Sequence, residues 1–91
     1  MKIAFSEQAW VDYAHWQKTD LVYVEKINGL IKECTRNPFK GTGKLEPLRR
    51  NLKGHWSRRI SQEHRLVYRV SGSGADQMLE VMSCRYHYEK N

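Results

Sequence analysis

Residues 55–70 read HWSRRISQEHRLVYRV, and this stretch decides the fold class. In each of its two halves, His55 to Ile60 and Arg65 to Val70, the side chains sort onto two faces with a period of two residues. This pattern is typical of strands that bury one face. The polar residues Ser61 to His64 between them predict a tight turn. We therefore expect a β-hairpin with one face on the core.

A third strand is expected after this hairpin. Residues 71–74 read Ser-Gly-Ser-Gly, which is typical of a turn, and apolar residues return from Gln77 to about Tyr86. The three strands together predict an antiparallel meander. In a regular strand, Leu79 would lie on the same face as Arg85 and His87, because these positions are an even number of residues apart. The sequence therefore leaves open whether a bulge interrupts the strand or both of its faces are partly buried.

The N-terminal residues predict a short strand and a first helix. Lys2 to Phe5 is the strand, with alternate apolar side chains on one face. Ser6 is the expected N-cap of the helix, because its side-chain oxygen can accept a hydrogen bond from a free amide of the first turn. Trp10, Tyr13 and Ala14 have the i, i+3, i+4 spacing of one helical face, which is typical of a helix.

A second helix is the clearest element of the sequence. Asp20 is its expected N-cap, and Asn37-Pro38 ends it, because the residue before proline is disfavoured in the α region. One face carries an unbroken apolar stripe, which consists of Tyr23, Val24, Ile27, Leu30, Ile31 and Cys34. Such a stripe is typical of a helix that packs on a sheet, and a groove for a partner protein is the alternative interpretation.

These elements predict an α+β fold in one domain over residues 1–91. Two N-terminal helices are expected to pack on one face of a four-stranded sheet in which antiparallel pairs dominate. Residues 40–54 are expected to form a loop with one short turn of helix near Leu45 to Leu52. Residues 41–44 superficially resemble a phosphate-binding loop. They lack its full spacing and a preceding strand, which argues against a nucleotide-binding P-loop.

The charge distribution favours a polyanionic partner. The chain has 16 Lys and Arg against 10 Asp and Glu, and residues 41–91 hold ten of the basic groups but only five acidic ones. If the apolar residues of the hairpin face the helices, Arg59, Arg65 and Arg69 line the open face of the sheet. Arginine presents a planar fork of donors that matches phosphate oxygens. Nucleic acid is therefore the expected partner, and an ordinary solvated face with cross-strand ion pairs is the alternative.

Cysteine usage and hydropathy place the protein in a reducing, aqueous compartment. Cys34 and Cys84 show no disulfide framework, and we expect two small buried side chains. No apolar run is long enough to span a membrane, and the first residues lack the apolar core of a signal peptide. The four histidines show no ligand spacing, so no metal or other cofactor is expected. We expect a cytoplasmic protein.

Two residues are candidates for acid–base chemistry. Glu46 is surrounded in the sequence by Lys and Arg residues, and a carboxylate held among cations can act as a base. Its alternative interpretation is a helix N-terminal carboxylate before Pro47. His87 is flanked by an arginine and two tyrosines, which makes it a candidate general acid. A simply exposed histidine near the chain end is the alternative.

Three segments carry a distinctive combination of motifs. The first is Asn-Pro-Phe at residues 37–39 with Gly-x-Gly-Lys-x-Glu-Pro-Leu at residues 41–48. The second is Trp-Ser-Arg-Arg-Ile at residues 56–60 with Glu-His-Arg-Leu-Val-Tyr at residues 63–68, and the third is Cys-Arg-Tyr-His-Tyr at residues 84–88. In this order and spacing they resemble the YoeB toxins of the RelE-like superfamily of type II toxin–antitoxin systems, and the resemblance covers nearly the whole chain.

The resemblance implies a microbial RNase-like fold and a toxin that inhibits translation. Such a toxin cleaves messenger RNA in the ribosomal A site without a metal, by attack of a ribose 2′-hydroxyl. By position, Glu46 is then the general base, Arg65 stabilises the transition state, and His87 is the general acid, with Tyr88 beside it. The residues that would hold RNA or ribosomal phosphates are Lys44, Arg49 and Arg59.

The partners implied by the resemblance are messenger RNA, the 70S ribosome with its ribosomal RNA, and a YefM-like antitoxin. The sequence leaves the oligomeric state open, a homodimer included. Two features depart from the family: a longer turn near Ser71 to Gln77, and the tail Glu89-Lys90-Asn91. The alternative function is a non-catalytic RNA- or ribosome-binding module that blocks translation by occupancy and needs neither Glu46 nor His87.

Overall fold

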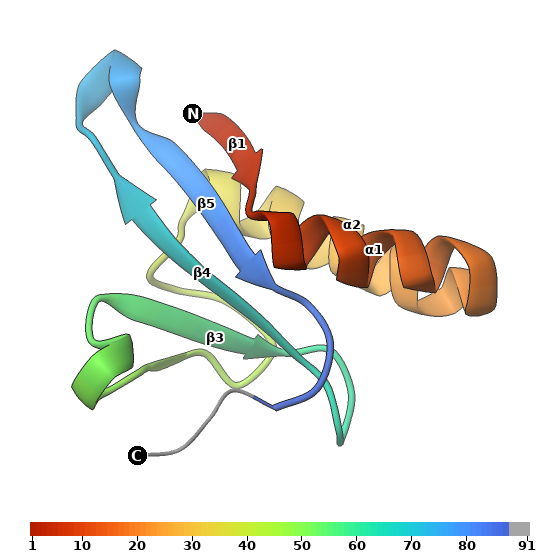
Figure 1. Cartoon of the computed structure of the whole chain (residues 1–91). Helices are drawn as coiled ribbons and strands as arrows, with labels where there is room; N and C mark the ends of the chain where they lie inside the picture. Colours follow the sequence, from red (N-terminus) through yellow and green to blue (C-terminus); the bar gives the residue numbers. More distant parts are fainter. Residues whose placement is uncertain (88–91) are drawn as a thin grey trace.

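The computed structural model describes residues 1–87, and it shows two helices packed on one face of a sheet (Figure 1). The predicted site residue Tyr88 and the tail Glu89-Lys90-Asn91 lie outside the described residues. The elements are, in chain order, β1 (Lys2–Phe5), α1 (Glu7–Thr19), α2 (Leu21–Arg36), β2 (Glu46–Pro47), the 3₁₀ helix η1 (Arg50–Leu52), β3 (His55–Arg59), β4 (Arg65–Ser71), the 3₁₀ helix η2 (Gly74–Asp76) and β5 (Met78–Ser83).

Within the described residues the sheet has five strands, in the order β1-β5-β4-β3-β2. The pairs among β2, β3, β4 and β5 are antiparallel, and β1 pairs with β5 in parallel. The predicted α+β class and the antiparallel meander are confirmed. The predicted count of four strands is wrong, because β2 adds a two-residue edge strand inside the expected loop. Two residues are too few for alternation to be visible, and Pro47 is tolerated because β2 is at an edge.

A β-bulge resolves the ambiguous parity of the last strand. Tyr68 pairs with Val81, but the next residue, Val67, pairs with Ser83, so Met82 is an extra residue in β5. As a result, Val81 and Cys84 are both fully buried although their parities differ. The carbonyl of Met82 accepts a hydrogen bond from the hydroxyl of Ser6, at 2.8 Å.

The two helices begin where the sequence predicts. The hydroxyl of Ser6 accepts from the amide of Ala9, and the carboxylate of Asp20 accepts from the amide of Val22. The second helix ends at Arg36, as expected from Asn37-Pro38. No helix among the described residues is long and apolar enough to cross a membrane.

The core-facing side of α1 is centred on other residues than the apolar spacing marks. Ala9, Asp12 and Trp16 are buried and Tyr13 packs partly buried against the core, whereas Trp10 is 56% exposed. One of the residues that faces the core is the charged Asp12. Its burial is explained by a hydrogen bond across the molecule, since its carboxylate accepts from the amide of Cys84 at 3.0 Å.

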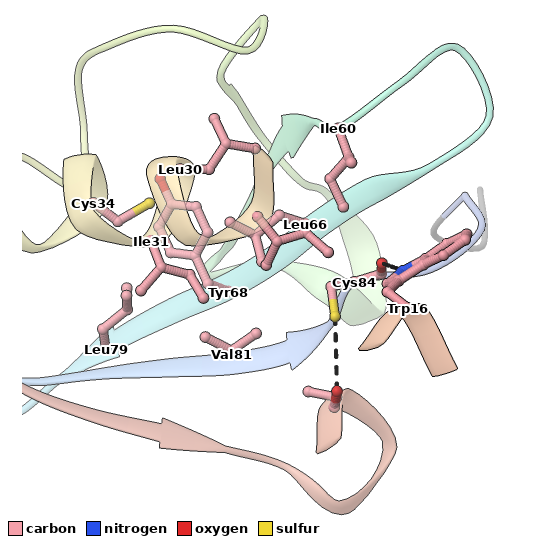
Figure 2. Close-up of a cluster of buried hydrophobic side chains, with 12 residues drawn as sticks. Trp16, Leu30, Ile31, Cys34, Ile60, Leu66, Tyr68, Leu79, Val81 and Cys84 are labelled. Carbon is pink, nitrogen blue, oxygen red and sulfur yellow. Dashed lines mark hydrogen bonds between the residues drawn. The ribbon is translucent and has the colours of Figure 1, made fainter. Parts of the chain in front are cut away.

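The apolar stripe of α2 packs on the sheet, which confirms the prediction (Figure 2). Ile27 and Cys34 of this stripe are fully buried, and so are Leu66 and Tyr68 of β4. Both cysteines are free thiols in this core. Burial raises the pKa of Cys34, and it raises that of Cys84 to about 12, so both act as small apolar residues.

A buried arginine holds the segment that leads from α2 into the sheet. The Arg58 side chain is fully buried between Trp56 and Ile60 on the helix-facing side. Its Nε donates to the hydroxyl of Tyr68 at 3.2 Å, and its Nη1 lies 3.4 Å from a carboxylate oxygen of Glu33. Its remaining hydrogen bonds go to the carbonyls of Asn37 at 3.0 Å, Lys40 at 2.8 Å and Thr42 at 3.3 Å.

We expect Arg58→Met to lower the free energy of unfolding by about 3 kcal/mol, because one buried hydrogen bond to Tyr68 and three part-buried hydrogen bonds to carbonyls are lost, at about 1 kcal/mol each. Urea denaturation at neutral pH measures this loss. Arg69→Met is the matched control: Arg69 also pairs with a glutamate, at 2.9 Å, but its side chain is 47% exposed. Its loss should be much smaller, and equal losses would contradict the structural role of Arg58.

Candidate active site

The open face of the sheet, opposite the helices, gathers several predicted site residues. Arg59 of β3 and Arg65 of β4 are directly opposite each other in the register. One alternation along β3, Ser57 pairs with Val67 on one side and with Glu46 of β2 on the other. Glu46 is therefore a diagonal neighbour of Arg59 across β2 and β3. Cβ atoms in such diagonal positions are about 7–8 Å apart or less.

Arg59 and Arg65 form a pair of like charges. Directly opposite residues of antiparallel strands have Cβ atoms about 4.5–5.5 Å apart, and like charges in these positions repel. Among the residues that the structure describes, neither arginine forms an ion pair with a carboxylate. The Nε of Arg59 is buried and has no hydrogen-bond partner within residues 1–87. This arrangement is suited to an anion that bridges the two guanidinium groups.

Arg69 lies on the same open face, as predicted, but its charge is compensated. Its Nε and Nη2 donate to the two carboxylate oxygens of Glu80, at 2.9 and 3.3 Å. These hydrogen bonds raise the pKa of Arg69 and lower that of Glu80. The alternative interpretation, a cross-strand ion pair, therefore holds for Arg69, and the uncompensated cations of this face are Arg59 and Arg65 among the residues that the structure describes.

Arg65 is held by the turn of the hairpin. Its Nη1 donates to the carbonyls of Ser61 at 2.8 Å and His64 at 3.1 Å. Its backbone amide donates to the carbonyl of Tyr86 at 3.0 Å. Arg65 therefore links the hairpin to the segment that precedes His87.

The C-terminal segment is anchored to α1 immediately after β5. The carboxylate of Asp12 accepts from the amide of Cys84, and the indole Nε1 of Trp16 donates to the carbonyl of Cys84 at 2.9 Å. The Cys84 thiol lies 3.7 Å from the carbonyl oxygen of Ala9 (Figure 2). Both main-chain groups of Cys84 are thus fixed from the helix side, three residues before His87.

The chain turns back two residues after this anchor (Figure 1). Tyr86 adopts a left-handed backbone conformation, with φ of 64°. Its amide donates to Nδ1 of His64 at 2.7 Å, and its carbonyl accepts from the amide of Arg65. His87 follows directly and is exposed. The structure therefore brings His87 beside the strand end that carries Arg65.

The remaining predicted site residues flank this centre at the edge of the sheet. Glu46 is exposed in β2, so its alternative interpretation as the first turn of a helix is wrong. Lys44 is exposed in the turn before β2, and this turn is tied to β3 by a hydrogen bond from the amide of Arg59 to the carbonyl of Gly43. Arg49 is exposed at the start of η1.

The glycine-rich residues 41–44 enclose a carboxylate of the chain itself. The amide of Thr42 donates to Glu33 at 2.8 Å, and its hydroxyl donates to the other carboxylate oxygen at 2.7 Å. These hydrogen bonds lower the pKa of Glu33. This amide is therefore already occupied, in agreement with the argument against a nucleotide-binding loop.

Sequence reasoning missed three residues that position the site: Asp12, Trp16 and His64. The first two are four residues apart on one face of α1, and a charged residue on the buried side of a helix signals a partner elsewhere in the fold. His64 was predicted only as a polar turn residue, and no sequence pattern indicates its contact with Tyr86. Within residues 1–87, no group of three or more His, Cys, Asp or Glu side chains is placed to hold a metal ion.

Comparisons with known proteins agree with this architecture. A family model described as the YoeB-like toxin of bacterial type II toxin–antitoxin systems matches residues 5–88. Toxin YoeB of Escherichia coli strain K12 is 56% identical over 88 residues, which are 97% of this chain and 100% of that protein. The solved structure of the YoeB/ParE toxin from Agrobacterium tumefaciens is 57% identical, with a TM-score of 0.93, over 97% of this chain and 100% of that one.

A third relative has been solved in two assemblies. YoeB from Staphylococcus aureus, as a dimer, is 47% identical to this chain and has a TM-score of 0.86. The same toxin in a heterotetrameric YoeB–YefM toxin–antitoxin complex has a TM-score of 0.85. In both cases the match covers 97% of this chain and 98% of the toxin.

We expect Asp12→Ala to lower the free energy of unfolding by about 1–3 kcal/mol, because the buried amide of Cys84 loses its acceptor. Asp12→Asn is the matched control, since the amide oxygen of asparagine can still accept this hydrogen bond. Urea denaturation and hydrogen exchange of the Cys84 amide measure the two effects. Faster exchange in the alanine variant alone is the expected result, and unchanged exchange in that variant would contradict the anchor.

Proposed function

The chain belongs to the YoeB-like toxins of bacterial type II toxin–antitoxin systems, and we propose that it is a ribosome-dependent endoribonuclease that cleaves messenger RNA in the ribosomal A site. The observation that carries the proposal is the paired Arg59 and Arg65 on the open face, with Glu46 diagonal to Arg59. A hydrogen bond from Arg65 to Tyr86 holds the residue before His87 against the same centre. We propose that this region combines a base, Glu46, a cationic centre and an acid, His87.

The proposed reaction needs two proton transfers and one charge-stabilising group. Glu46 removes the proton of a ribose 2′-hydroxyl, and the oxygen attacks the adjacent phosphorus. The bond from phosphorus to the 5′-oxygen breaks, and His87 donates a proton to that oxygen. Arg65 offsets the charge of the pentacoordinate phosphorane. The products are a 2′,3′-cyclic phosphate and a 5′-hydroxyl, and we propose that Tyr88 acts beside His87.

The flanking cations extend this centre into a binding track for RNA. Arg59 directly opposes Arg65, and a phosphate between them relieves their repulsion. Lys44 and Arg49 are exposed before and after β2, and they continue the positive surface past Glu46. We propose that these three residues bind phosphates of the messenger or of ribosomal RNA.

The ribosome supplies what the chain itself lacks. One carboxylate and one histidine give acid–base catalysis that raises the rate by about 10²–10⁴-fold. Much of the remaining acceleration then has to come from alignment of the RNA. We propose that the ribosome holds the messenger in the geometry for in-line attack, so the protein acts in the cytoplasm on translating ribosomes and inhibits translation.

A YefM-like antitoxin is the proposed protein partner. The Staphylococcus aureus relative forms a heterotetrameric complex with YefM, and it has also been solved as a dimer. We extend both assemblies to this chain as proposals. An antitoxin segment that covers the open face, or displaces the residues around His87, would separate the acid from Arg65 and switch off cleavage.

The decisive experiment compares Glu46→Gln and His87→Gln with the unmodified toxin on programmed ribosomes. We expect each to reduce A-site cleavage by about 10²-fold or more, because each removes one proton transfer, while ribosome binding persists. Glu25→Gln, on the exposed side of α2, is the control and should cleave normally. Undiminished inhibition of translation by the His87 variant would favour the non-catalytic binder, and equal cleavage of naked RNA would contradict ribosome dependence.

We expect cleavage to need no metal from the toxin, because Glu46, His87 and Arg65 already account for both proton transfers and the charge stabilisation. The measurement is the cleavage rate with EDTA added, at a free magnesium concentration that keeps ribosomes intact. The rate should be unchanged. A rate that falls with EDTA and returns on addition of zinc or manganese would overturn this expectation.

A further inference from the structure

We propose that His64 is a positioning residue: its neutral ring holds the main chain at Tyr86 and thereby aims His87 into the active site. The proposal rests on the proposed function for its kinetic consequences only. The anchoring itself is a property of the free protein and can be tested without RNA. His64 is distinct from the proposed acid and base, and it acts through a backbone hydrogen bond.

The hydrogen bond fixes the chemical form of the ring. The amide of Tyr86 donates to Nδ1 of His64 at 2.7 Å. A ring nitrogen accepts a hydrogen bond only when it carries no proton, so this contact requires the neutral imidazole with its proton on Nε2. Protonation of Nδ1 would place one N–H group against another and break the contact.

The ring is rigidly held, as a positioning residue requires. The amide of His64 donates to the hydroxyl of Ser61 at 3.2 Å, and its carbonyl accepts from the amide of Ile60 at 2.9 Å. The imidazole lies edge to face with the ring of Trp16, at a centroid distance of 4.8 Å, and with that of Tyr23, at 5.6 Å. Both helices therefore support the ring that binds Tyr86.

The conformation of Tyr86 makes this support necessary. A non-glycine residue with a φ of 64° is strained, and it keeps this conformation only where surrounding contacts enforce it. The two enforcing contacts are the hydrogen bond to His64 and the one from the amide of Arg65. If the first is lost, Tyr86 can relax to an ordinary backbone conformation, and the next residue, His87, changes direction.

The charges around His64 favour its neutral form. Burial lowers the pKa of His64, Glu63 beside it acts in the opposite direction, and Arg85, His87 and His15 lower the pKa further. The other titratable groups that face the ring are Tyr23 of α2 and Tyr86 of the C-terminal segment.

The consequence is that the hydrogen bond that positions His87 forms only within a limited pH range. A lowered pKa means that the folded protein binds the His64 proton less readily than the unfolded chain does. The stabilisation is therefore complete above the ordinary histidine pKa of about 6.5 and is lost as pH falls toward the lowered value. His87 must carry a proton to act, while His64 must carry none on Nδ1. Acidification that protonates His64 should thus reduce cleavage.

Three variants test the proposal on programmed ribosomes. His64→Phe keeps an aromatic ring but removes the acceptor, and we expect kcat to fall by on the order of tenfold to a hundredfold, with ribosome affinity unchanged. His64→Asn offers a non-titrating oxygen near the position of Nδ1, so it should restore most of kcat and remove the decline at acid pH. His15→Phe is the matched control, because His15 also packs on Trp16, at 4.8 Å, and should leave kcat unchanged.

A measurement on the unmodified free protein separates this proposal from the proposed function. NMR should detect a scalar coupling across the hydrogen bond between the amide nitrogen of Tyr86 and Nδ1 of His64, which disappears on acidification. A coupling in a protein that cleaves no RNA would contradict the proposed function and leave the anchor standing. Absence of the coupling at neutral pH, or a His64→Phe variant that folds and has an unchanged kcat, would overturn the positioning role.

Discussion

The hydrogen bonds between α1 and Cys84 are the constraint on which the rest of the structure depends. Asp12 and Trp16 hold the amide and the carbonyl of Cys84, and they join the first helix to the end of the last strand. The bulge at Met82 is needed for this contact, because it turns Cys84 toward the helices after Val81 has already faced them. A carboxylate is buried on α1 for the same reason, and the apolar spacing of that helix is interrupted there.

The base side of the site is held by a second buried polar group. Arg58 binds the carbonyls that lead from α2 toward β2, and Glu46 follows on the opposite face of the sheet. Each side of the proposed site is thus held by contacts on the helix-facing side of the sheet. Asp12 holds the segment that leads to His87, and Arg58 holds the segment that leads to Glu46. The face that carries Arg59 and Arg65 keeps these arginines in repulsive register, and the contacts of Asp12 and Arg58 lie on the other side of the sheet. The buried polar contacts that support the fold and the proposed site thus lie on opposite faces of one sheet.

Local patterns predicted the parts of the fold that depend on local physics. The stripe of α2, its cap at Asp20 and the alternation of the hairpin were sufficient for the α+β class and for the open face that carries Arg59 and Arg65. The remaining features depend on contacts distant in sequence. The two-residue β2, the bulge in β5 and the ion pair between Arg69 and Glu80 leave no periodic signal. Glu46 was a candidate base because cations surround it in the sequence, whereas the role of His87 rests mostly on the family resemblance, and both roles remain proposals.

The pairing of the first strand with the last has a consequence for synthesis. The contacts of Asp12 and Ser6 with the end of β5 join residues 72 and 76 positions apart. An N-terminal segment that leaves the ribosome first has no β5 to pair with, and its helices cannot bury their inner faces until the C terminus emerges. A nascent copy therefore holds no complete site while it is still being made. The proposed active site is therefore complete only after the whole chain has been synthesised.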